Sequence, residues 1–378
     1  MSIFNFSADL KAASSLFLET SCSVDIGKRV IEFDWLEALS IYLVCSIHYP
    51  VFSSNSICSQ IWHFFALTAV PIFFAVHGAL LLRKQFNFKK HLKRLIKTVK
   101  YLILFKLVVY CLFLLFGLMD PIPTISGLLN YFITCSDSDG FPVEHTWFIY
   151  ALISIYFVYP VIALAFQENR KVVTAIGLSF LIALMCCNAL NMLQISLFGT
   201  VKYSFMNAIS FANPFGIWSF YLCIFICGPW IFDFLKHYIG IRCVVLAFLA
   251  IFSGIALLMF EYFALYGTYC WTGQVLPDQY IQFGVALEVF GLVVLINNIC
   301  PAFEGTRIVS AVQQLSENTL FIFYLHMPVL WLMNYCIGWK HGFISNLMRA
   351  AVVFIVIAIV GVSFKRLFKN KPSKKMSV

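Results

Sequence analysis

The stretch CVVLAFLAIFSGIALLMFEYFAL, residues 243–265, determines the class of fold. It contains 23 residues, of which only Glu261 is acidic or basic. A helix of about 20 consecutive apolar residues is long enough to cross the hydrocarbon core of a bilayer. The stretch therefore predicts a transmembrane helix.

The composition of the whole chain excludes a water-soluble protein. Hydrophobic residues make up 61% of the 378 residues and charged residues only 11%, compared with about 45–50% and about 25% in soluble domains. So few charges cannot cover the surface of a soluble chain of this length. Similar apolar blocks predict an all-α polytopic membrane protein with about ten spans, at 35–54, 61–82, 101–118, 146–166, 172–193, 211–235, 243–265, 280–300, 318–336 and 347–364.

The basic residues predict the orientation of the chain. With the N-terminus in the cytoplasm, 22 of the 26 Lys and Arg residues fall in inner segments and 3 in outer segments, while Lys106 lies inside a span. Basic residues concentrate in cytoplasmic loops, so we expect a protein of the plasma membrane (the bacterial inner membrane) with both termini in the cytoplasm. The net charge of +9 then needs no nucleic-acid partner. We expect a cytoplasmic segment at 1–34, a transmembrane domain at 35–366 and a basic cytoplasmic tail at 367–378.

One inner segment has the pattern of an amphipathic helix that lies at a membrane interface. In FKKHLKRLIKTVK, residues 88–100, five apolar residues fall on one helical face and six basic residues occupy the rest. Two interpretations are open. The cluster either binds anionic lipid headgroups or forms a cytoplasmic site for a phosphorylated cofactor.

Polar residues at membrane depth are candidates for function, because ionisable groups are costly there. They either converge on an interior polar cavity or serve as structural partners between helices. The candidates are Glu37, His48, His77, Lys106, Glu288 and His326. Glu37 and His48 share a helical face but lie about 16 Å apart, so they cannot form a hydrogen-bonded pair. The 13 cysteines show no CxxC or Cys/His spacing, and no metal site is predicted.

Five segments, in order along most of the chain, resemble motifs of the acyltransferase-3 family of membrane proteins, which O-acylate cell-surface carbohydrates and related acceptors. They are FDWLEALSIYLVCSIH at 33–48, VPIFFAVHG at 70–78, RLIK at 94–97, HTWFIY at 145–150 and LSENTLFIFYLH at 315–326. Two positions depart from the family pattern. Glu37 stands where the family has Arg or Lys eleven residues before its essential His, and His77 stands where it has Ser before Gly78.

The resemblance implies transfer of an acyl group, acetyl in the first instance, from cytoplasmic acyl-CoA to a hydroxyl of an outward or membrane-embedded acceptor. His48 would be the catalytic residue, as a general base or a transient acyl carrier. Arg94 and Lys97 would bind the phosphates of the donor. Asp34 and Glu37 would lie near the inner mouth of the site. Trp147, Tyr150 or backbone amides would donate hydrogen bonds to the oxyanion, although Trp147 also fits an aromatic anchor at the interface.

The missing cation at Glu37 leads to a more specific expectation. Glu37 lies about two residues into its predicted span and Lys106 about six residues into its own, so their depths differ by only about 6 Å. We therefore expect an ion pair in which Lys106 replaces the basic residue of the family and helps to bind the donor. The alternative is that Glu37 lies in water at the headgroup boundary.

Two other classes of function are open. A polytopic transporter or a lipid or glycan flippase also has many spans and intramembrane charges, and a receptor or scaffold would need no chemistry. For an acyltransferase, the acceptor is open among a polysaccharide repeat, a lipid-linked sugar, lipid A and a peptidoglycan-type glycan, and succinyl is open in place of acetyl.

Overall fold

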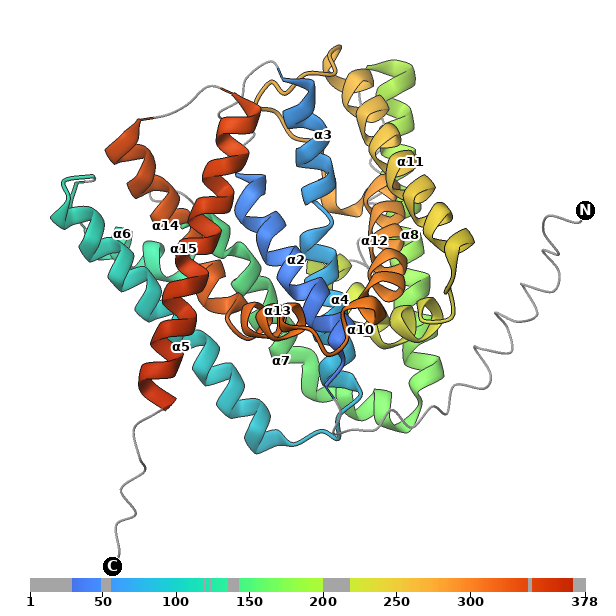
Figure 1. The fold of residues 1–378 in the computed structure, drawn as a ribbon, viewed down its shortest axis with the longest axis horizontal. Helices are drawn as coiled ribbons and strands as arrows, with labels where there is room; N and C mark the ends of the chain where they lie inside the picture. The colour runs from blue at the N-terminus through green and yellow to red at the C-terminus, as the bar shows by residue number, and fades with distance from the viewer. Residues whose placement is uncertain are drawn as a thin grey trace, which may run out of the picture.

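The computed structural model of the protein describes residues 29–48, 56–118, 120–122, 124–134, 143–199, 218–338 and 342–369. All of the elements in these ranges are helices (Figure 1), which confirms the predicted all-α fold. Within the same ranges, the helical segments long and apolar enough to span a membrane number nine. They are Ile57–Leu82, Phe88–Leu115, Glu144–Glu168, Arg170–Phe198, Trp218–Leu235, Ile241–Tyr266, Phe283–Phe303, Thr319–Ile337 and Phe343–Lys365.

The first predicted span corresponds to α2, Ile31–Ile47, which is 17 residues long. Residues 49–54 of that predicted span lie outside the described residues. α2 is a central helix of the bundle, with α3, α4, α13, α14 and α15 packed around it (Figure 1). Leu36, Ile41 and Leu43 are fully buried, because a helix surrounded by other helices buries apolar residues on all sides.

The second predicted span consists of two helices, α3 (Ile57–Ala66) and α4 (Ala69–Leu82). The predicted interfacial segment and third span are instead joined in one helix, α5 (Phe88–Leu115). Asn87 caps the start of α5, since its side chain accepts a hydrogen bond from the backbone N–H of Lys90 at 2.9 Å. The helix is 28 residues long, which corresponds to about 42 Å.

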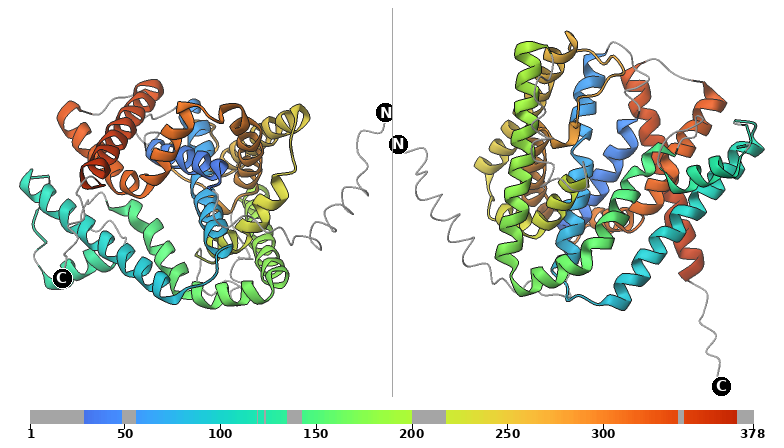
Figure 2. Two further views of the ribbon diagram at one scale, coloured as in Figure 1. Left: turned by 60° about the horizontal axis from the view of Figure 1, so that its bottom comes forward. Right: turned by 180° about the vertical axis from the view of Figure 1, so that it is seen from behind.

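The other helices complete the bundle. They are α6 (Ile125–Ile133), η2 (Glu144–Thr146), α7 (Trp147–Glu168), α8 (Arg170–Phe198), α10 (Trp218–Leu235), α11 (Ile241–Tyr266), η4 (Gln279–Ile281), α12 (Phe283–Ile299), η5 (Cys300–Phe303), α13 (Arg307–Glu317), α14 (Thr319–Ile337) and α15 (Phe343–Lys369). Seen from behind, α8 stands upright along one side of the bundle and α5 leans away at the other (Figure 2).

Glycines bring the backbones of α4 and α10 into close contact. A Cβ atom at Gly78 would lie 1.9 Å from the carbonyl oxygen of Phe225, and one at Gly228 would lie 2.1 Å from that of Ala75. Small residues allow this approach in membranes, where helices associate through close packing. The contact fixes α4 next to α10.

α4, α7 and α10 end, and α5 and α8 begin, at the same end of the bundle (bottom of Figure 1). We call this the basic end, since Arg83, Lys84, Arg94, Arg170 and Lys236 lie there.

Candidate active site

Three histidines from distant parts of the chain meet inside the bundle. His48 caps the C-terminus of α2, His145 lies in η2 just before α7, and His326 belongs to α14. The ring centroids of His48 and His326 are 5.3 Å apart, and those of His145 and His326 are 4.9 Å apart. Of the residues predicted to converge on an interior cavity, His48 and His326 lie together, and His145 joins them.

A small cavity lies beside the trio, and we call it the histidine cavity. Its volume is about 40 Å³, whereas a single water needs about 10–15 Å³ on this scale. The space is therefore sufficient for about three heavy atoms, the number in an acetyl group. His48, His145, Trp147, Tyr280 and Phe323 are among the residues that line it.

The hydrogen bond of His326 fixes its tautomer. The Nδ1 atom lies 2.6 Å from the carbonyl oxygen of Phe323, and a carbonyl can only accept, so Nδ1 carries the proton in the neutral ring. The Nε2 atom is then an acceptor, and it has no hydrogen-bond partner among the residues that the structure describes. His326 thus presents an unprotonated nitrogen within the trio.

The predicted ion pair between Glu37 and Lys106 is wrong. The Nζ atom of Lys106 donates to the carbonyl oxygens of Tyr131 and Thr134, at 2.6 and 2.5 Å, and to the hydroxyl of Tyr150 at 2.9 Å. Lys106 lies eighteen residues into α5, about 27 Å from its start at the basic end, and joins α5 to α6. Donor binding is therefore not a role that we assign to Lys106.

Tyr150 takes part in the same structural contact. Besides accepting from Lys106, its hydroxyl donates to the carbonyl oxygen of Phe132 at 2.9 Å. The side chain thus faces α6, and it is not one of the residues that line the histidine cavity. Of the two predicted oxyanion donors, only Trp147 lines the cavity, where its indole also packs against Tyr221 and Tyr280 with ring centroids 5.6 Å apart in each case.

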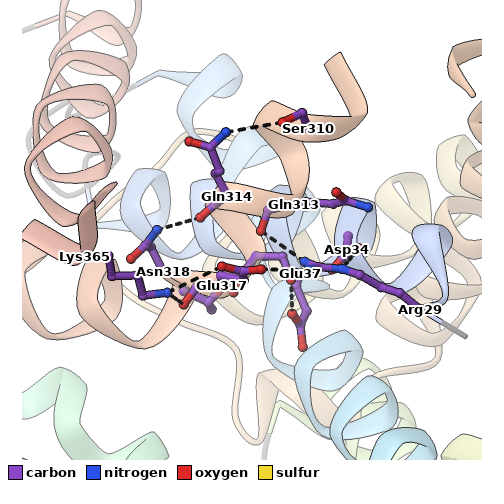
Figure 3. Close-up of polar contacts among 11 residues, drawn as sticks. Arg29, Asp34, Glu37, Ser310, Gln313, Gln314, Glu317, Asn318 and Lys365 are labelled. Atoms are coloured by element: carbon purple, nitrogen blue, oxygen red, sulfur yellow. Dashed lines mark hydrogen bonds and ion pairs between the residues drawn. The ribbon is translucent and has the colours of Figure 1, made fainter. Parts of the chain in front are cut away.

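The cation beside Asp34 and Glu37 is Arg29 (Figure 3). Its guanidinium donates to both carboxylate oxygens of Asp34, at 2.7 and 2.9 Å, and to Glu317 of α13 at 2.7 Å. The hydrogen bond to Asp34, with that to Glu317, raises the pKa of Arg29 above its usual value, so this cation stays charged. Glu37 accepts a hydrogen bond from Ser316 of α13 at 2.5 Å.

Together these contacts attach α13 to the start of α2, and we call them the Arg29 clasp. The Nζ atom of Lys365, from α15, adds a hydrogen bond to the carbonyl oxygen of Glu317 at 2.5 Å (Figure 3). The clasp lies at the start of α2 and His48 at its end, so Glu37 and His48 act at separate places, as their spacing predicts.

His77 contributes to a second polar group, nearer the basic end. Its Nε2 atom lies 2.7 Å from the hydroxyl of Tyr156 in α7. The half-buried Arg94 is close enough to act electrostatically on both residues. Lys97 is exposed on the next turn of α5, with its Nζ atom 5.4 Å from the ring centroid of Tyr101. His77 therefore lies with Arg94 and not with the histidine trio.

A buried carboxylate organises further cations at the basic end. Asp233 of α10 accepts hydrogen bonds from Arg83 at 2.9 Å and from Arg170 at 2.5 Å, and the Nζ atom of Lys236 lies 3.6 Å away. Three positive charges face one negative charge, which leaves a net charge of +2 in this group. The basic end is thus suited to a polyanionic ligand.

Glu288 lies in a different part of the bundle from the trio. It is fully buried in α12, and its Cγ atom would be 2.7 Å from a Cβ atom at Gly254 of α11. Neither carboxylate oxygen has a hydrogen-bond partner within the described ranges. Glu288 is not among the residues that line the histidine cavity.

Sequence reasoning missed His145 and Arg29 as members of these groups. The signal for His145 was its place at the head of the segment HTWFIY, immediately before a span. Arg29 was counted only as an orienting charge, although five residues separate it from Asp34.

A family model described as an acyltransferase domain, of the acyltransferase-3 type, matches residues 30–366. Searches of curated proteins and of solved structures found no significant match. The matched range contains the histidine trio, the Arg29 clasp except for Arg29 itself, and the cations of the basic end named above.

Proposed function

The chain belongs to the acyltransferase-3 family, and on this premise we propose that it transfers an acyl group, acetyl in the simplest case, from acyl-CoA to a hydroxyl of a cell-surface or lipid-linked carbohydrate. The observation that carries this proposal is the meeting of His48, His145 and His326 beside an interior cavity the size of an acetyl group. We also propose that the basic end faces the cytoplasm of a bacterial inner membrane, with both termini on that side, as the distribution of Lys and Arg predicts.

In the proposed reaction, neutral His48 acts as general base. It accepts the proton of the acceptor hydroxyl while the hydroxyl oxygen attacks the thioester carbonyl carbon. The new C–O bond forms, the C–S bond breaks, and the proton passes from His48 to the sulfur of the departing CoA. The unprotonated Nε2 of His326 supports this role, because it can accept a hydrogen bond from a neighbouring imidazole. Trp147, which lines the cavity, is the proposed oxyanion donor.

The donor would bind from the basic end. Acyl-CoA is a polyanion, and its phosphates are best matched by guanidinium and ammonium groups. Arg94 and Lys97 are the proposed phosphate contacts, with the positive group around Asp233 beside them. His77 and Tyr156 lie within electrostatic range of Arg94, so we assign them to the pantetheine arm, between the phosphates and the histidine cavity.

Replacement of His48 tests the chemistry. We expect His48→Ala to lower acyl transfer by about 10²–10⁴-fold, the usual contribution of general acid–base catalysis, in purified protein that retains its wild-type melting temperature. The matched control is His237→Gln, which changes an exposed histidine after α10. More than about a tenth of wild-type activity in His48→Ala would remove His48 from the mechanism.

Replacement of the basic-end cations tests the donor site. We expect Arg94→Ala and Lys97→Ala to weaken binding of acyl-CoA in a calorimetric titration, and added salt to weaken wild-type binding as well, because contacts to phosphate in a solvated region are screened. Lys89→Ala removes the same charge from the exposed start of α5 and is the control. If both test variants bind acyl-CoA with wild-type affinity, the basic segment 88–100 serves only to orient the protein and to bind lipid headgroups.

A further inference from the structure

A second and larger cavity lies between α4, α8, α10 and α12, and we call it the apolar cavity. Its volume is about 200 Å³, and its wall is almost entirely hydrocarbon. Pro71 and Ala75 of α4 line it, together with residues of α10 from Phe220 to Leu235. A phosphate, a sugar or a pantetheine arm would lose its hydrogen bonds to water in such a place, so the cavity is suited only to hydrocarbon.

The shape of the apolar cavity favours a linear chain. Phe220 and Leu235 are fifteen residues apart on one helix, which corresponds to about 22 Å along its axis. A compact cavity of about 150 Å³ holds one benzene molecule. A volume of about 200 Å³ is sufficient for an alkyl segment of about eight carbons on the same scale.

The two cavities are separated by Tyr280, which lines both of them. The ring of Tyr280 packs between Trp147, at 5.6 Å, and Tyr221, at 6.1 Å between centroids. α4 also contributes to both walls, with Val70 on the histidine cavity and Pro71 on the apolar cavity. The two cavities are therefore neighbours, with the ring of Tyr280 between them.

The apolar cavity is open at its side and closed at the basic end. Ala286 at its rim is exposed, and Leu181 and Phe290 are half-buried. These residues belong to membrane spans, so the opening lies at the depth of lipid hydrocarbon. Leu235, the lining residue nearest the basic end, is by contrast only 3% exposed. A chain thus enters from the bilayer and not from the cytoplasm.

From this geometry we propose that the apolar cavity binds the hydrocarbon chain of the acceptor, and that the acceptor is a lipid or lipid-linked sugar drawn laterally from the bilayer. The proposal rests on the proposed function in one respect, since the hydroxyl of the bound lipid is acylated at the histidine cavity. Tyr280 is a positioning residue that sets the distance between chain and hydroxyl.

Photolabelling tests the binding of the chain without reference to activity. The protein in nanodiscs is irradiated with an alkyl β-glucoside whose chain carries a diazirine, and the labelled peptides are identified by mass spectrometry. We expect labelling of α10 and α12 in the wild type. Val289→Trp, which fills the cavity from α12, should lower it about tenfold or more, since burial of two or more methylene groups is lost. The matched control is Val356→Trp on the exposed face of α15.

An activity assay then shows whether the hydrocarbon chain in the apolar cavity belongs to the acceptor or to the acyl donor. With acetyl-CoA as donor, we expect octyl β-glucoside to be a better acceptor than methyl β-glucoside, and Val289→Trp to reduce that preference by about ten- to a hundredfold, since misplacement of a reacting group has effects up to this size. Activity with methyl β-glucoside should remain. If Val289→Trp misfolds, Ala286→Phe at the exposed rim replaces it.

Three outcomes overturn the proposal. Equal labelling of the wild type and the filled variants would mean that the chain binds only the outer surface. If Val289→Trp no longer uses octanoyl-CoA as donor but keeps the wild-type preference between the two glucosides, the apolar cavity binds the acyl chain of the donor. A wild type that uses both glucosides equally would show that the acceptor needs no chain. If labelling behaves as expected but no acceptor supports acyl-CoA consumption, the proposed function fails and the lipid site stands.

Discussion

Adding a methyl group at Gly78 should destabilise the protein, although the same change stabilises most helices. In an exposed helix, Gly→Ala gains about 1 kcal/mol. Here the new Cβ atom would lie 1.9 Å from the carbonyl oxygen of Phe225, whereas ordinary contacts begin at 3.4 Å. The backbones of α4 and α10 would have to separate by about 1.5 Å. Overpacking of this kind costs about 1–3 kcal/mol. At the upper end of this range, the cost exceeds the gain of about 1 kcal/mol in helix propensity.

The measurement is thermal unfolding followed by tryptophan fluorescence in nanodiscs, at one scan rate because membrane proteins unfold irreversibly. We expect Gly78→Ala to lower the melting temperature by about 2–6 °C. Gly177→Ala is the matched control, since its new Cβ would meet only side-chain atoms of Ile226 and Cys227, which can move. The double variant Gly78→Ala with Gly228→Ala should lower the melting temperature by less than the sum of the two single variants, because both methyl groups disturb the same contact between α4 and α10. A melting temperature at or above that of the wild type in Gly78→Ala would refute the reasoning.

Three further predictions concern orientation and the two polar contacts outside the histidine trio. A cysteine placed at position 90 in a cysteine-free background should not react with an impermeant maleimide in intact cells, and reaction from outside would reverse the proposed orientation. Lys106→Met should release α6 and increase proteolysis near residue 130, since the carbonyl oxygens of Tyr131 and Thr134 lose their hydrogen bonds to the ammonium group; wild-type cleavage would contradict this role. Arg29→Gln should lower the melting temperature more than Arg29→Lys, because only the guanidinium can bind both oxygens of Asp34; equal losses would mean that charge alone matters.

The fold was predictable because hydropathy alone specifies spans. Apolar blocks of about 20 residues are required to cross a bilayer and are rarely needed elsewhere. The same reasoning placed His48 and His326 within spans, where a histidine away from water requires polar partners. It could not choose among the histidines, since hydropathy gives depth but not rotation about the helix axis. His77 accordingly turned out to contact Tyr156 and not the trio.

The error at Lys106 has a definite cause. Its depth was counted from a predicted boundary at residue 101, whereas α5 begins at Phe88 and runs unbroken through the basic segment. Thirteen additional helical residues correspond to about 20 Å, which moves Lys106 away from Glu37 and toward α6. The sequence indicated the nearness of Arg29 to Asp34 but not its contact with Glu317, because residues 29 and 317 meet only when α13 packs on α2.

The histidine trio becomes complete only late in the synthesis of the chain. His48, His145 and His326 lie on α2, η2 and α14, so the third member emerges only after most of the spans have been made. A nascent chain arrested before α14 holds two histidines but not the nitrogen that completes the group. In the proposed mechanism, a product that stops before α14 therefore lacks the complete catalytic group.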